Sequence, residues 1–282
     1  MISAIVRAVL RRTVAADLAP AGDENPEMPP WPGTPPPEIP SGRVAVWFYR
    51  AWDLFGAGFV FAVFSGLALA SLESPGNESR ELSPKLIALN IGFQFLIAGI
   101  VAAFVLPRVR LATWLGLRWS KWPWLLLIAP ASVLFMWVVF GSLQMSGYVK
   151  WMESLGVETV QDTVQLLQTS EDPLVLGLMA CAAVIAAPLC EEIVFRGYLY
   201  PVLKTFTGIR PAAICSALVF AAAHGNLTAL LPLFLFGGLL VFVYEKTGSL
   251  WAPVAVHFCF NGATVAIQIA ARYLELPIQA PQ

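Results

Sequence analysis

Three apolar stretches in the C-terminal half of the sequence contain the polar side chains that could do chemistry. An ionisable group inside a membrane-spanning helix costs roughly a few kcal/mol on insertion scales, so each one is a functional hypothesis by default. Both histidines of the chain fall in these stretches. In chain order the polar residues are Glu191, Glu192 and Arg196, then His224, then His257 and Asn261. A single histidine or one Glu-Arg pair is often only a contact between helices, but the three groups together predict one shared site.

Helical geometry gives the two adjacent carboxylates different roles. Glu192 and Arg196 are four residues apart and share a face, so they can form a charge pair that lowers the cost of burying both. Glu191 points about 100° away and lacks that partner. An unpaired carboxylate in an apolar setting is suited to act as a general base near neutral pH. His257 and Asn261 are also four apart, so an imidazole and an amide lie on one face.

The depth of these groups can be compared if the first two stretches form a hairpin that turns near 207–208. Glu191 precedes this turn, and His224 follows it, by 16 residues each, or about 24 Å of helix. His257 is only seven residues past Leu250, or about 10 Å along its helix. The three groups therefore meet only if the hairpin at 204–210 projects from the membrane by roughly one to two turns.

The composition indicates which kind of structural elements must position these groups. Of 282 residues, 58% are hydrophobic and 12% are charged, with a mean hydropathy of +0.71, whereas soluble domains are about 25% charged. The net charge is -1 without a basic stripe, which argues against nucleic-acid binding. A span needs roughly 20 mostly apolar residues. The sequence predicts an all-α polytopic bundle with about seven spans, at about 53–72, 86–106, 122–143, 174–204, 209–225, 228–245 and 251–271.

The remaining segments are expected to be peripheral. Residues 1–45 are polar and rich in proline, which predicts a disordered cytoplasmic tail. Residues 46–170 are expected to hold the first three spans and, at 150–168, either an interfacial helix or an ordinary loop helix. Residues 171–275 are expected to form the core that carries the site. The cysteines lack the CxxC spacing of a zinc or redox site and are interpreted as small buried residues.

Lysine and arginine residues in the loops predict the orientation. On the side of the N-terminus lie nine: Arg43, Arg50, Arg108, Arg110, Arg118, Lys121, Lys204, Arg210 and Lys246. On the other side lie four: Arg80, Lys85, Lys150 and Arg272. This asymmetry favours a cytoplasmic N-terminus and an exterior C-terminus. Short loops and the lack of a signal or transit segment suit a bacterial inner membrane.

The ordered motifs resemble one protein family. Glu191-Glu192-x-x-x-Arg196, Phe220-x-x-x-His224 and His257-x-x-x-Asn261 are similar to the motifs of the CAAX prenyl endopeptidases and bacteriocin-processing proteases, also called Abi proteins. The resemblance covers about residues 174–265. It implies an intramembrane endopeptidase that cleaves a membrane-associated substrate, such as a prenylated CaaX-like protein or a leader peptide, at a cavity open to the cytoplasm.

The resemblance also implies a role for each motif residue. Glu191 would activate water, and His224 would help to bind that water or move protons. His257 and Asn261 would stabilise the oxyanion, while Glu192 and Arg196 would hold the helix geometry. Phe220 would pack beside the site or serve only as core. Zinc could bind to Glu191, His224 and His257, although the HExxH arrangement is absent, and catalysis by glutamate without a metal is the favoured interpretation.

Two other functions are weighed against this one. Buried glutamate and histidine residues also build proton relays, so a proton-coupled membrane transporter is an alternative. The first three spans hold no counterpart of the polar cluster, and no inverted repeat is visible. A non-catalytic scaffold or immunity protein of the same family is the second alternative, against which the intact set of polar residues argues.

Overall fold

The computed structural model describes residues 42–73, 83–117, 119–157, 167 and 170–274. Within these residues the fold is helical and contains no strand, which confirms the all-α prediction. The long helices are α2 (Asp53–Glu73), α3 (Pro84–Val105), α5 (Leu125–Met145), α11 (Ile209–Ala222), α12 (Leu227–Thr247) and α13 (Trp251–Tyr273). A further long segment joins α8 (Pro173–Cys181), η2 (Ala182–Ala186), α9 (Ala187–Glu191), η3 (Glu192–Leu199) and α10 (Tyr200–Thr207). The short helices are α4 (Leu111–Trp114), η1 (Trp122–Trp124) and α6 (Tyr148–Ser154).

The helices have the length and surface of a membrane bundle. Among the described residues five helical segments are long and apolar enough to span a membrane, and two shorter apolar helices, at Asp53–Leu67 and Ile209–Ala222, accompany them. Together they correspond to the seven predicted spans. Large apolar side chains face outward, with Phe55 81% and Leu126 74% exposed. A soluble fold would not leave this surface uncovered, so the chain is an integral membrane protein.

Local signals in the sequence set the helix ends. Ser83 and Asp172 each accept a hydrogen bond from a backbone N–H of the first helical turn that follows, at α3 and α8, and each precedes a proline. This is the favoured chemistry for a helix start. Asn226 caps α12 in the same way. Gly208, with φ of +84°, separates α10 from α11, because a left-handed φ is accessible mainly to glycine.

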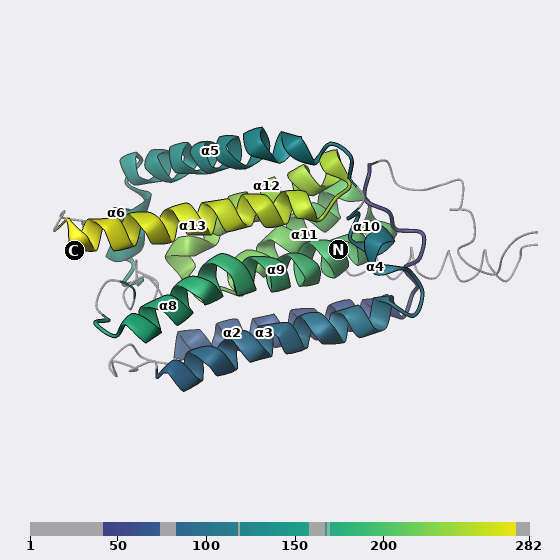
Figure 1. The fold of residues 1–282 in the computed structure, drawn as a ribbon, viewed down its shortest axis with the longest axis horizontal. Helices are drawn as coiled ribbons and strands as arrows, with labels where there is room; N and C mark the ends of the chain where they lie inside the picture. Colours follow the sequence, from purple (N-terminus) through teal and green to yellow (C-terminus); the bar gives the residue numbers. More distant parts are fainter. Residues whose placement is uncertain (1–41, 74–82, 118, 158–166, 168–169, 275–282) are drawn as a thin grey trace, which may run out of the picture.

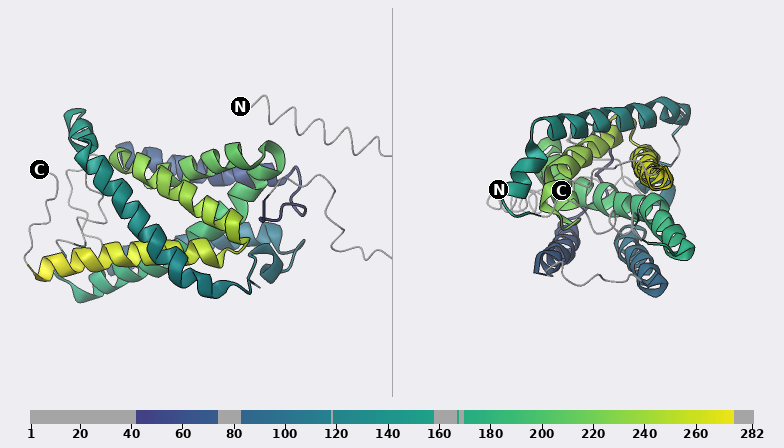
Figure 2. Two further views of the ribbon diagram at one scale, coloured as in Figure 1. Left: turned by 90° about the horizontal axis from the view of Figure 1, so that it is seen from above. Right: turned by 90° about the vertical axis from the view of Figure 1, so that its left-hand side faces the viewer.

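The helices are arranged around the segment from α8 to α10 (Figure 1). In the end-on view of Figure 2, the blue helices α2 and α3 lie on one side and the teal helix α5 on the opposite side. Helix α11 packs chiefly on α12, α13 packs on α5, and α3 packs on α9. The motif-bearing helices therefore lie between two outer layers.

The predicted peripheral segments are only partly described. Residues 1–41 of the expected tail lie outside the described residues, whereas Val44, also assigned to the tail, is buried in the main core. Of the expected helix at 150–168, helix α6 covers the beginning, and most of the remainder lies outside the described residues. The bundle thus begins a few residues before the predicted boundary.

Candidate active site

The first motif lies on a helix that is widened at two places. The N–H of Ala187 donates to the carbonyl of Ala182, and the N–H of Tyr200 donates to that of Phe195. Both are i to i-5 bonds, typical of π-helical turns, which occur often at functional sites. Proline follows each widened turn, at positions 188 and 201, and proline removes a helix donor. Glu191 ends the α-helical turn between the two π-helical segments, and Glu192 begins the second of them.

Glu192 and Arg196 form the charge pair that their spacing predicts. Arg196 Nη1 lies 2.9 Å from Glu192 Oε1, and both side chains are fully buried. Arg196 Nη2 also donates to the carbonyl of Gly237 on α12 at 3.2 Å. A buried ion pair needs such additional hydrogen bonds to offset the loss of hydration. The pair therefore connects the π-helical segment η3 to α12.

His257 joins the same carboxylate. Its Nδ1 lies 2.9 Å from Glu192 Oε1, and Glu192, which pairs with Arg196 as a carboxylate, accepts the hydrogen. In the neutral ring this leaves Nε2 as an acceptor. His257 Nε2 lies 4.0 Å from Glu191 Oε2, which is too far for a direct hydrogen bond but suits a single bridging water. The side chains of Glu191 and His257 are 20% and 3% exposed.

The oxygens at this position are not satisfied by protein donors. Among the described residues, the buried atoms Glu191 Oε2, Glu192 Oε2 and Arg196 Nε have no hydrogen-bond partner. Buried polar atoms in native proteins are nearly always paired with protein groups or with water. The unpartnered oxygen of Glu191 thus marks a place where a water or a substrate group would be stabilised.

Phe220 is the residue on which the three motifs converge. Its buried ring lies 4.9 Å from the ring of His224 and 5.8 Å from that of His257, both edge-on. The guanidinium of Arg196 lies 4.3 Å from the same ring centroid, in a cation-π contact. His224 Nδ1 also contacts the carbonyl of Phe220 at 2.9 Å. Phe220 is therefore both core and a direct support of the polar side chains.

Asn261 donates a hydrogen bond to a backbone carbonyl that a proline leaves without a backbone donor. Its Nδ2 donates to the carbonyl of Ala183 at 2.8 Å. In the i to i-5 pattern of η2, the donor to this carbonyl would be residue 188, which is proline and has no N–H. One amide hydrogen of Asn261 thus replaces a missing backbone donor, and an amide has a second hydrogen to give.

The possible metal ligands do not form a ready-made cluster. Among the described residues, no group of three or more His, Cys, Asp or Glu side chains is placed to hold a metal ion. A zinc site requires at least three protein ligands at about 2 Å from the ion. Glu191, His224 and His257 do not meet that requirement as they stand.

Several contributors to the site are not visible in the sequence motifs. Phe236 packs edge-on against His257, with ring centroids 5.2 Å apart. Gly237 supplies the carbonyl for Arg196, and an added Cβ there would meet Ala217 Cα at 3.0 Å. The pair Gly237-Gly238 in an otherwise apolar run was the only available signal, because glycine in a helix often marks a close approach of two backbones.

Comparison with known proteins shows which family this region resembles. Residues 173–263 match the family model described as "Type II CAAX prenyl endopeptidase Rce1-like". The protein described as "Putative membrane peptidase YdiL" of Bacillus subtilis (strain 168) is 27% identical over 144 residues, which are 50% of this chain and 55% of that protein. The chain therefore spans about half the length of this relative. No solved structure matches the chain.

These findings, with the helical membrane fold, define the class as a polytopic membrane protein whose C-terminal core resembles a family of membrane proteases. Residues 173–263 are similar to the CAAX prenyl endopeptidase family, which is the resemblance that the motifs predicted. The matched region contains all six predicted site residues. The family-model match does not extend to α2, α3 or α5.

Proposed function

We propose that this chain is an intramembrane endopeptidase that hydrolyses a peptide bond of a membrane-associated substrate. The observation that carries the proposal is the separation of 4.0 Å between Glu191 Oε2 and His257 Nε2. A water between these atoms would be within hydrogen-bond distance of both. The similarity to a family of membrane peptidases supports the same chemistry.

Each step of the reaction has a candidate group. Glu191 takes a proton from the water as its oxygen bonds to the carbonyl carbon of the substrate, whose carbonyl oxygen becomes an oxyanion. Collapse of this intermediate breaks the C–N bond, and Glu191 returns the proton to the leaving amine. His224, whose Nδ1 is engaged by the Phe220 carbonyl, has Nε2 left to bind water or relay protons.

The second amide hydrogen of Asn261 is a candidate for stabilising the oxyanion, and His257 is a second candidate in the form of the ring that carries a hydrogen on Nε2 as well as on Nδ1. Glu192 accepts a hydrogen bond at His257 Nδ1 and so orients the ring, as the carboxylate partner of a catalytic histidine does. Arg196 balances the charge of Glu192. Preorganised donors of this kind act strongly in a site from which bulk water is excluded.

The substrate and the setting of the site are also proposals. A CaaX-like prenylated protein or a leader-bearing peptide would suit the chemistry, and the lysine and arginine asymmetry favours a site that opens to the cytoplasm of a bacterial inner membrane. Zinc held by Glu191, His224 and His257 stays a prediction. Elemental analysis and chelation of an active preparation would decide it, since full activity without bound metal would remove zinc from the site.

The deciding variant is Glu191→Gln, which keeps the size of the side chain but removes the base. Membrane peptides from cells with wild-type or Glu191→Gln protein are compared by proteomics, and a peptide cleaved only by the wild type is used to assay purified protein. We expect activity to fall by about 10²- to 10⁴-fold, with insertion unchanged.

The matched control is Glu171→Gln, the same change at an exposed glutamate, and it should keep wild-type activity. Cleavage by Glu191→Gln at the wild-type rate would remove Glu191 as the base. The absence of any wild-type cleavage product, together with proton-coupled uptake in vesicles, would instead favour a transporter.

A further inference from the structure

The second widened turn of the site helix leaves the carbonyl of Gly197 without its ordinary donor. The helix returns to the α pattern at α10, where the donor to Gly197 would be residue 201. Residue 201 is proline and has no N–H. Gly197 is buried, so an unpaired carbonyl here would cost about 1–3 kcal/mol.

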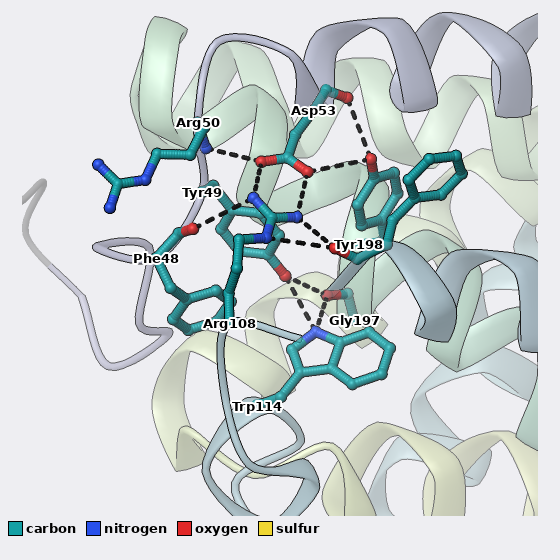
Figure 3. Close-up of polar contacts among 9 residues, drawn as sticks. Phe48, Tyr49, Arg50, Asp53, Arg108, Trp114, Gly197 and Tyr198 are labelled. Carbon is teal, nitrogen blue, oxygen red and sulfur yellow. Dashed lines mark hydrogen bonds and ion pairs between the residues drawn. The ribbon is translucent and has the colours of Figure 1, made fainter. Parts of the chain in front are cut away.

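Two side chains from outside the family-matched region supply the missing donors. The hydroxyl of Tyr49 donates to the Gly197 carbonyl at 2.6 Å, and Trp114 Nε1 donates to it at 2.8 Å. Trp114 Nε1 also lies 3.0 Å from the Tyr49 hydroxyl. Burial raises the pKa of the Tyr49 phenol well above its ordinary value, so the hydroxyl keeps its proton. Figure 3 shows both side chains directed at Gly197.

A charged contact holds the segment that follows Tyr49 in place. Both terminal nitrogens of Arg108 bind the carboxylate of Asp53 at 2.6 Å, and Asp53 accepts from the backbone N–H of Arg50 at 2.6 Å. The hydroxyl of Tyr198, the residue after Gly197, donates to the carbonyl of Asp53 at 3.2 Å. The segment 49–53 thus donates a hydrogen bond to the site helix and accepts one from it (Figure 3).

We propose that Tyr49 and Trp114 are positioning residues that take the place of the N–H missing at Pro201 and so fix the helix that carries Glu191, Glu192 and Arg196. This inference rests on the proposed peptidase activity. Asn261 binds the carbonyl of Ala183, five residues before the other proline, Pro188, and likewise supplies a donor that the backbone lacks. Gly197 directly follows Arg196, so a shift of its peptide moves the guanidinium that pairs with Glu192. A displacement of about 1 Å at a catalytic site can cost about 100-fold in rate.

The test is a double-mutant cycle between these donors and Pro201. Tyr49→Phe with Trp114→Phe removes both donors and leaves an aromatic ring, smaller at position 114, at each place, and we expect kcat to fall by about 10- to 100-fold with KM within about twofold. Pro201→Ala restores an N–H at position 201. In the Pro201→Ala background the same two substitutions should lower kcat by less than about threefold, because the carbonyl then has a backbone donor.

Tyr200→Phe is the matched control. It removes a buried hydroxyl at the same end of the molecule, one that donates to Glu245 at 2.6 Å and does not bind the helix backbone at Gly197. We expect kcat within about twofold of the wild type at a comparable loss of thermal stability. The proposal is overturned if the two donor substitutions lower kcat equally with proline and with alanine at position 201. It is also overturned if Tyr200→Phe lowers kcat as much as the two donor substitutions do.

Hydrogen exchange separates this proposal from the peptidase activity. In the full chain in lipid nanodiscs, the two donor substitutions should raise amide exchange at least about tenfold over residues 192–203, and Pro201→Ala should suppress the rise. Unchanged exchange would overturn the positioning role even if the wild type is an active peptidase. Faster exchange without a fall in kcat would show that the two donors do not influence the catalytic site. If the wild type is inactive as a peptidase but exchange changes as expected, only the proposed peptidase activity is rejected.

Discussion

Glu192 serves two partners through a single oxygen. Its Oε1 lies 2.9 Å from both Arg196 Nη1 and His257 Nδ1, whereas Oε2 is buried and has no partner among the described residues. The neighbouring Glu191 has no cationic side chain bonded to it and faces His257 only across 4.0 Å. The two adjacent glutamates therefore differ in their contacts, and the proposed mechanism assigns charge balance to Glu192 and proton transfer to Glu191.

This difference predicts that the same substitution affects protein stability at Glu192 but not at Glu191. Glu192→Gln leaves Arg196 as an unpaired buried cation, and breaking a buried pair on one side costs roughly 3–5 kcal/mol. We expect a lower folded yield and a lower melting temperature in detergent, whereas Glu191→Gln should keep both. Glu192→Gln with Arg196→Met removes both charges and should recover most of the yield without recovering activity. A single Glu192→Gln variant as stable as the wild type would show that the pair is dispensable.

At the scale of elements, the site depends on how closely α11 and α12 approach. An added Cβ at Gly237 would lie 3.0 Å from Ala217 Cα and 3.2 Å from Phe220 Cδ1, whereas one at the adjacent Gly238 would meet nothing within 4 Å. The contact places the Gly237 carbonyl within reach of Arg196 and holds the Phe220 ring between the two histidines. Helix packing here thus sets the geometry of the polar groups.

The two glycines provide a matched pair of variants. Gly237→Ala should force α11 from α12 and lower the free energy of unfolding by about 1–3 kcal/mol, with reduced peptidase activity because Phe220 and Arg196 move. Gly238→Ala adds the same methyl group in open space and should be neutral or stabilising by up to about 1 kcal/mol. Thermal unfolding and activity are measured for both. Equal behaviour of the two variants would contradict this account of the packing.

At the scale of the whole molecule, the sequence predicted what depends on local pattern and missed what depends on distant contact. Hydropathy located the spans to within a few residues, and the four-residue spacing predicted the pair of Glu192 with Arg196. The donors to Gly197 come from 148 and 83 residues away, and the pattern around Tyr49 and Trp114 is that of an ordinary loop. Pro201 signalled a lost helix bond but not which side chain would replace it.

The distribution of basic residues over the two ends of the bundle predicts the orientation of the molecule in the membrane. Arg43, Arg110 and Lys246 lie at the end where α10 meets α11, and Lys150 lies at the opposite end, where α6 follows α5 (Figure 1). Basic residues concentrate on the cytoplasmic side of membrane proteins. The end with Tyr49 and Trp114 is therefore expected to face the cytoplasm.

Two single cysteines can test this orientation in a background whose four native cysteines are replaced by serine. Arg110 and Lys150 are both exposed surface cations, so Arg110→Cys and Lys150→Cys are comparable changes at opposite ends. A membrane-impermeant thiol reagent should label Lys150→Cys in intact cells and Arg110→Cys only after the membrane is opened. Because the lysine and arginine asymmetry is the sole physical basis for the assignment, the reverse labelling pattern would invert the molecule and place the Gly197 contacts on the exterior side.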